Sequence, residues 1–154
     1  MNLERETGTQ ELFGKCYKAG EFLPFYIPRD YMPQIDEKDY AALYGYLKSR
    51  GVQFSFGMRP LTELKAHQRI SPVIADKVDV RDFNRSIMVS EDDFILDGNH
   101  RWLAHVRRGW STIACLNIVL PFEQAITTLC HFPKAYYYAD GNRHPFHQGT
   151  KTDV

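Results

Sequence analysis

The sequence has no excess of charge of either sign, because 19 lysines and arginines balance 19 aspartates and glutamates. The strongly basic composition that is typical of nucleic-acid binding is therefore absent overall. The chain also lacks an apolar run of about 18 residues or more, so we expect no transmembrane helix and no membrane partner. Its polar first residues, MNLERETGTQELFGK, do not have the pattern of a secretory signal.

Cysteine is scarce. Cys16, Cys115 and Cys130 are widely spaced, odd in number and form no Cys-x-x-Cys pair. This usage argues against a disulfide framework and against a thiolate zinc site, and it fits a protein of the reducing cytosol. No internal repeat or low-complexity segment is present, and 154 residues are enough for one domain with a sizeable core.

The first third of the chain is predicted to be an N-terminal extension, residues 1–56, that packs on the core. A weak helical pattern covers residues 10–18, and three prolines in residues 22–35 favour extended chain. A helix is predicted from Asp36, as its N-cap, to Arg50, with Gly51 ending it and Leu43 and Leu47 sharing one face. A strand is expected at residues 52–56.

The predicted core domain covers residues 57–133, and a polar tail, residues 134–154, is expected to lie loose or to wrap the surface. Pro72 suits the start of a helix. The pattern then predicts strands at 86–90 and 94–97 joined by an acidic turn, a helix at 99–108, a strand at 112–120 and a helix at 122–131. The fold class is therefore mixed, α/β or α+β, with a small sheet flanked by helices.

The joint between the strand at 94–97 and the following helix gathers polar residues, in the order Asp97-Gly98-Asn99-His100-Arg101. The first backbone N–H groups of a helix have no partner within it and carry the positive end of the helix dipole. Gly98 lets a ligand approach the backbone closely, and His100 and Arg101 add side-chain donors. Such a joint is suited to binding phosphate.

Asp97 has the wrong sign for direct contact with a phosphate, and a divalent cation between the two would resolve the repulsion. Mg²⁺ typically takes one or two carboxylates together with phosphate oxygens. The inferred ligand is thus a nucleotide phosphate chain with Mg²⁺. The alternative is that Asp97 is only a helix cap and that His100 and Arg101 are solvated. A second Asp-Gly-Asn, beginning at Asp140, is followed by Pro145 and is interpreted as a turn.

The stretch from about Arg59 to Leu120 resembles the ParB/sulfiredoxin superfamily. The residues that carry the resemblance are LTELKAHQ at 61–68, the two strands SIMVS and FILD, and ILDGNHRWLAH followed by Gly109. The nearest branch contains the free-serine kinase and phage proteins, and its pattern Asp-Gly-His-His-Arg-Trp corresponds to residues 97–102. The cysteine that sulfiredoxin has at this joint is replaced by Asn99, which argues against sulfinic acid repair.

The resemblance implies a nucleotide-binding phosphotransferase that acts on a hydroxyl of a small molecule or a modified nucleotide. It implies that ATP or ADP, or else CTP, binds through Gly98, Asn99, His100 and Arg101, and that Asp97 organises Mg²⁺. In the serine kinase the segment at 61–68 ends in a glutamate, where this chain has Gln68. An amide cannot accept a proton from a hydroxyl. Either another residue is the base, or Gln68 only positions the acceptor, or the chain binds nucleotide without that chemistry.

Two other classes of function stay open at this point. The chain could be a phage or mobile-element nuclease or DNA-binding protein, because residues 99–110 hold three arginines, two histidines and no acid. It could also be a regulator that binds nucleotide without catalysis. His144 and His147 have the spacing of half a metal site, but no acid or cysteine accompanies them.

Overall fold

The structure is a computed structural model that describes residues 9–12, 15–18, 32–66, 72–139 and 141–146. Its strands are β1 (Thr9–Leu12), β2 (Lys15–Lys18), β3 (Phe54–Pro60), β4 (Ile87–Val89), β5 (Ile95–Asp97), β6 (Thr112–Ile118), β7 (Tyr136–Ala139) and β8 (Asn142–Pro145). Its α-helices are α1 (Tyr40–Ser49), α2 (Pro72–Asp76), α3 (Asn99–Arg107) and α4 (Phe122–Cys130). Short 3₁₀ turns, η3 (Glu37–Asp39), η4 (Leu61–Glu63) and η5 (Val80–Asn84), precede α1, follow β3 and precede β4.

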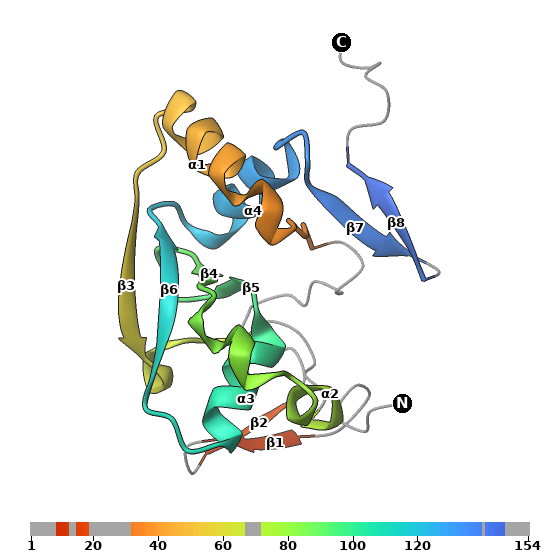
Figure 1. The fold of residues 1–154 in the computed structure, drawn as a ribbon. Coiled ribbons are helices and arrows are strands. Elements are labelled where there is room, and N and C mark those ends of the chain that lie inside the picture. The colour runs from red at the N-terminus through yellow and green to blue at the C-terminus, as the bar shows by residue number, and fades with distance from the viewer. Residues whose placement is uncertain (1–8, 13–14, 19–31, 67–71, 140, 147–154) are drawn as a thin grey trace.

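A mixed four-stranded sheet in the order β3-β6-β4-β5 forms the centre of the fold. β3 and β5 run antiparallel to their neighbours, whereas β4 and β6 are parallel and are connected through β5 and α3. The predicted α+β class with a small mixed sheet is thereby confirmed. Figure 1 shows α1 and α4 near one end of the sheet and α3 with α2 near the other.

Two apolar clusters lie on opposite faces of this sheet, because successive residues of a strand point to opposite sides. Ile87, Val89 and Ile95 pack with Trp102 and Leu103 of α3. Met88 and Leu96 point the other way and pack with residues of α1 and α4. The strands at the centre are therefore buried on both faces, which is why they read as continuous apolar runs rather than as alternating patterns.

Most of the predicted elements from residue 36 onward are present, within a few residues of their expected ends. Leu43 and Leu47 form the buried face of α1, and Gly51 and Gly109 follow α1 and α3 with φ of 71° and 78°. The helical pattern at residues 10–18 gave a wrong prediction, because β1 and β2 pair there as an antiparallel hairpin. β3 begins at Phe54 and crosses the boundary that was expected at residue 56.

The chain returns to its own N-terminal half through a second hairpin, β7–β8. Ala139 pairs with Asn142, and Gly141 has a φ of 77°, so the described residues of the second Asp-Gly-Asn, Gly141 and Asn142, lie at the turn of the hairpin. The backbones of Gln34 and Tyr136 exchange hydrogen bonds of 2.7 and 3.0 Å. The described part of the predicted tail therefore forms a hairpin that is bridged to the segment before α1 at Gln34. No helix in the described ranges is long and apolar enough to span a membrane.

Asp36 has a different role from the predicted N-cap. Its side chain accepts no hydrogen bond from the first turn of the helix. Instead, its carboxylate accepts two hydrogen bonds from the Arg143 guanidinium, at 3.0 and 3.1 Å, and one from the Tyr136 hydroxyl at 2.9 Å. A tertiary ion pair with β7–β8 replaces the local cap, and it ties the segment before α1 to the C-terminal hairpin.

Candidate functional site

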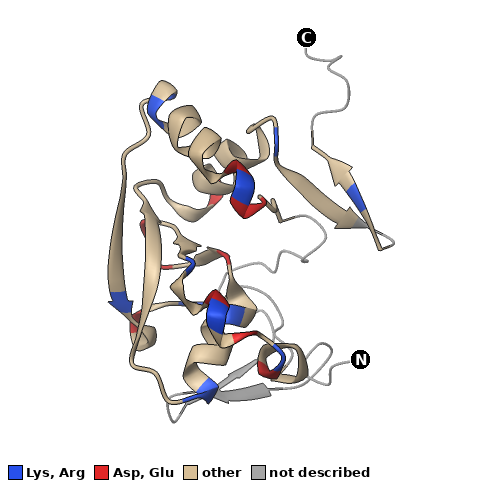
Figure 2. Cartoon of the chain, viewed as in Figure 1, with Lys and Arg blue, Asp and Glu red and all other residues tan. Residues whose placement is uncertain are grey.

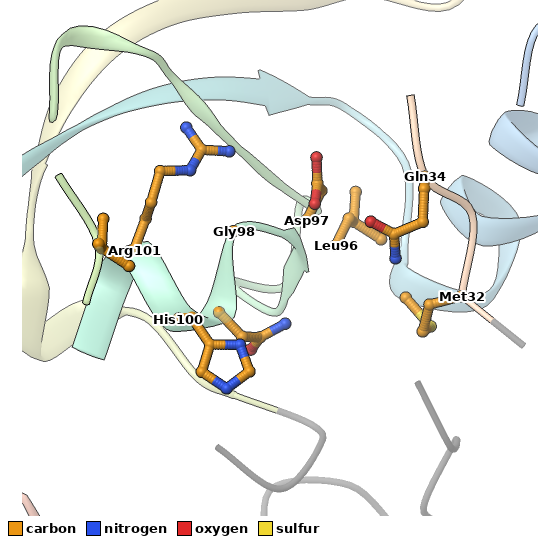
Figure 3. A pocket seen from close by; sticks show the side chains of 9 residues that line it. Met32, Gln34, Leu96, Asp97, Gly98, His100 and Arg101 are labelled. Carbon is orange, nitrogen blue, oxygen red and sulfur yellow. The ribbon is translucent and has the colours of Figure 1, made fainter. Parts of the chain in front are cut away.

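A pocket of about 140 Å³ opens at the joint between β5 and α3. Five of its lining residues are consecutive, Asp97 to Arg101, and Leu96 and Val78 complete that side. Met32 and Gln34 form the opposite wall, and Figure 3 shows them facing Leu96, Asp97 and Gly98 across the pocket. The sequence-predicted nucleotide-binding residues are thus brought together around one cavity.

The backbone at this joint is built to present N–H groups. Gly98 has φ 106° and ψ 23°, which is the left-handed region, and Asn99 begins the right-handed helix. Such a change of hand turns successive N–H groups toward a common point and creates an anion-binding concavity. The first hydrogen bond within the helix is donated by the Trp102 N–H to the Gly98 carbonyl at 2.9 Å. The N–H groups of Asn99, His100 and Arg101 precede it and have no acceptor within the helix.

Gly98 is required here for space as well as for conformation. A Cβ at this position would lie 2.3 Å from Ile87 Cγ2 and 2.7 Å from Ile87 Cβ, far inside van der Waals contact. The joint therefore packs directly on β4. This close approach is the structural reason for a glycine between the strand and the helix.

Arg101 is committed to the protein's own backbone. Its Nη1 donates to the carbonyl oxygens of Arg85, at 3.0 Å, and Ser86, at 3.3 Å. In Figure 3 its guanidinium extends to the opposite side of the joint from the His100 imidazole. Arg101 thus fixes the entry to β4 through Nη1 and contributes positive charge to the pocket.

Asn99 supplies an unused acceptor in the pocket. The residue is 4% exposed, and its buried Oδ1 has no hydrogen-bond partner within the described part of the chain. A buried polar atom without a partner costs roughly 1–3 kcal/mol, which a bound group with a donor or a cation would offset. Together with the Asp97 carboxylate, Asn99 gives the lining of the pocket two oxygen-bearing side chains beside the N–H groups of the helix.

Tyr40 and Arg85 adjoin the site and were not identified from the sequence. Burial raises the pKa of Tyr40, and the negative charge of Asp97 raises it further, whereas the charges of Arg101 and Arg85 act in the opposite direction. The Tyr40 hydroxyl is buried and makes no hydrogen bond of standard geometry with the residues that the structure describes. Both residues come from elements far from the joint in sequence, and no local signal marks them.

The basic residues between 99 and 110 mainly hold the fold together. Arg107 forms a two-pronged pair with Asp76 of α2, at 2.6 and 2.9 Å, and Arg108 donates to the Asp76 carbonyl at 2.9 Å. His105 is 1% exposed, and its Nδ1 lies 2.7 Å from the Arg101 carbonyl oxygen. Figure 2 shows positive and negative positions interspersed along the described chain rather than gathered by sign.

The remaining candidate residues from the sequence either lack the surroundings of a metal or nucleophile site or lie outside the described residues. Gln68 and His147 fall outside them. His144 stacks on Tyr137, and the described residues contain no group of three or more possible metal ligands among His, Cys, Asp and Glu. Burial raises the pKa of the Cys115 and Cys130 thiols to about 11, so neither is a thiolate nucleophile at neutral pH.

Comparisons with protein-family models, with curated proteins and with solved structures give no match. A function therefore has to be inferred from the chemistry of the pocket.

Proposed function

We propose that the chain is a nucleotide-binding phosphotransferase with a ParB/sulfiredoxin-like fold, which binds a phosphate group at the start of α3. The observation that carries the proposal is the pocket at this joint. It combines the N–H end of α3 at residues 99–101, the left-handed Gly98 and an acidic side chain at Asp97. A neutral or apolar ligand would not use this combination, whereas a phosphate oxygen accepts directly from such N–H groups.

The size of the pocket fits the phosphate end of a nucleotide. Its volume of about 140 Å³ is well below the roughly 300–1,000 Å³ of pockets that enclose a drug-sized ligand. The pocket is therefore proposed to hold a phosphate group, while the sugar and base of ATP, ADP or CTP extend beyond it. His100, which lines the pocket, is proposed to contact the phosphate.

The donors around the pocket fit a magnesium ion. Mg²⁺ prefers hard oxygen ligands and is usually held by one or two carboxylates and by phosphate oxygens. Asp97 supplies the carboxylate, and the Asn99 amide supplies a further oxygen, Oδ1, which has no hydrogen-bond partner among the described residues. When bound, the ion would neutralise charge on the phosphate oxygens, which is the largest requirement of phosphoryl transfer.

The arrangement of elements also supports the proposed family. Two short antiparallel strands, β4 and β5, lead into the Asp-Gly-Asn-His-Arg joint, α3 follows, and β6 returns parallel to β4. This is the strand–strand–helix–strand order in which the resemblance places its phosphate-binding motif. The acceptor is proposed to be a hydroxyl of a small molecule or modified nucleotide, with Gln68 positioning it. Tyr40 is a poor alternative base because burial raises its pKa.

A thermal-shift panel tests nucleotide binding. ADP, ATP and CTP are added with and without Mg²⁺, and a DNA oligonucleotide is included. Saturating ligand at about 100 times its Kd stabilises a protein by about 2.7 kcal/mol, which raises Tm by several degrees. The proposal expects that rise for at least one nucleotide and a larger rise with Mg²⁺. An unchanged Tm with every nucleotide would overturn the proposal. A rise in Tm with the oligonucleotide alone would indicate a nucleic-acid-binding protein instead.

Two substitutions then test the site. Asp97→Asn removes the charge that holds Mg²⁺ and is expected to abolish the Mg²⁺-dependent part of the shift and the transfer of radiolabelled phosphate. Glu91→Gln makes the same chemical change at an exposed position outside the pocket and should leave both unchanged. Equal turnover of wild type and the Asp97 variant would remove Asp97 from the mechanism. A nucleotide shift without any turnover would leave a binding protein rather than an enzyme.

A further inference from the structure

β3 is an edge strand whose outer side is unpaired within the described residues. The sheet order places β6 on one side of β3, and Figure 1 shows β3 at the margin of the sheet with no other labelled element beyond it. The Val119 N–H donates to the Gln53 carbonyl, and the Leu61 N–H donates to the Ser111 carbonyl. Odd-numbered residues of this strand therefore direct their backbone groups toward β6.

The even-numbered residues of β3 direct their backbone groups outward. Phe54, Phe56 and Met58 each present an N–H and a carbonyl, and Pro60, which has no N–H, ends this row. The side chains at the centre of the row are apolar and exposed, with Phe56 at 54% and Met58 at 60%. An edge with unpaired backbone groups beside apolar side chains is a template for another β-strand.

We propose that this edge binds a second copy of the chain, so that two four-stranded sheets join as one across a two-fold axis at Phe56. An antiparallel pair centred on Phe56 sets Phe54 of each copy opposite Met58 of the other. Every outward N–H in the row from Phe54 to Met58 then meets a carbonyl. The edge is complementary to itself in both hydrogen bonding and apolar character.

Charge also favours a second copy. None of the residues from Phe54 to Met58 is charged, so self-pairing opposes no like charges. The nearest charge, Arg59, is held by the protein itself through Asp93 at 2.6 Å, Asn117 at 3.0 Å and Glu63 at 3.2 Å. The charged side chains that commonly protect an edge strand are therefore missing along this row.

An apolar groove continues the surface beyond Met58. It has a volume of about 660 Å³ and is lined by Met58, Val80, Phe83, Trp110 and Ala114, with Arg81 and Asn84 at its margin. Val80 and Trp110 are 57% and 45% exposed. A strand pair alone buries little area, and stable interfaces bury about 1,200 Å² or more in total. The groove supplies additional apolar surface next to the paired strands.

Engineered disulfides test the arrangement and its register. In the proposed pair the Cα atoms of the two Phe56 residues lie about 5.5 Å apart, which is within the range that a disulfide can bridge. Phe56→Cys is expected to form a covalent dimer on mild oxidation of the full chain. Ser55→Cys, one residue away, lies opposite Gly57 of the other copy and should not cross-link with itself. Wild type, with its native cysteines, gives the background.

Sedimentation velocity of the full-length chain supplies the second readout. Wild type is expected to be a dimer that becomes monomeric in Met58→Lys, a change at an exposed side chain that leaves the bonds to β6 intact. Val73→Lys, at an equally exposed apolar residue of α2, should remain a dimer. A wild type that stays monomeric at high concentration overturns the proposal. So does a dimer that persists in Met58→Lys, or equal cross-linking of the two cysteine variants.

Discussion

Gly98 and Ile87 are in direct contact across the joint, so that a Cβ on Gly98 would lie 2.3 Å from Ile87 Cγ2. The substitution Gly98→Ala therefore combines a steric clash with a left-handed backbone, and it should lower the free energy of unfolding by about 2–4 kcal/mol. Gly109→Ala is the matched control, because Gly109 has a φ of 78° and no atom within 4 Å of its added Cβ. It should cost only about 1–2 kcal/mol. Urea unfolding measures both, and equal losses would mean that Ile87 accommodates the methyl group.

Trp102 anchors α3 to the segment that follows β3. The indole is 1% exposed, and its Nε1 donates to the Leu61 carbonyl at 3.1 Å. Trp102→Phe leaves that carbonyl without its donor and creates a cavity, so we expect a loss of about 2–4 kcal/mol in urea unfolding followed by circular dichroism. Trp110→Phe, at a residue that is 45% exposed, should cost less than about 1 kcal/mol. Similar losses for the two variants would contradict the anchoring role.

His105 should make stability depend on pH. Burial is the main cause that lowers its pKa, and the charges of Arg101 and Arg108 lower it further, while the hydrogen bond to the Arg101 carbonyl acts in the opposite direction. The folded state therefore prefers neutral histidine. The resulting stabilisation is present above the unfolded-state pKa of about 6.5 and is lost as pH falls through the lower folded-state pKa. Its slope is at most about 1.4 kcal/mol per pH unit.

The variant His105→Gln keeps a hydrogen-bond donor and removes the titration. The free energy of unfolding is to be measured for both proteins between pH 7 and pH 5. Wild type should lose more stability over this range than the variant does. Parallel pH profiles would show that other groups cause the dependence.

The ion pair between Asp36 and Arg143 should matter more for ligand binding than for stability. Arg143 is half-exposed, so Arg143→Met is expected to cost no more than about 1 kcal/mol of stability. The same change removes one of the contacts that hold the segment carrying Met32 and Gln34, one wall of the pocket, and should weaken nucleotide binding several-fold. Arg81→Met breaks an exposed pair with Asp79 that lies outside the pocket, and it serves as the control. Equal nucleotide affinities of the two variants in calorimetric titrations would show that the Asp36–Arg143 pair does not support the pocket.

The sequence was most informative where structure is determined locally. The strand–glycine–helix pattern at Asp97 to Arg101 predicted the joint that lines the pocket. The end of the strand, the left-handed glycine and the start of the helix are all determined by residues close together in the sequence. The same reasoning missed Tyr40, Arg85 and Gln34, which reach the site through long-range packing. It also misassigned residues 10–18, where a weak helical pattern competes with strand pairing that no local signal records. The prediction that Asp36 is a helix N-cap was wrong for a related reason. Its carboxylate binds Arg143, which lies far along the chain.

The pocket wall at Met32 and Gln34 is held by a hairpin that the ribosome makes last among the described elements. A nascent chain can assemble its sheet and place α3 before β7 and β8 have emerged. The pocket at the start of α3 would then be complete only after this hairpin has been made. Chains interrupted after α4 would lack the backbone bonds between Gln34 and Tyr136, and with them the support of one wall of the pocket.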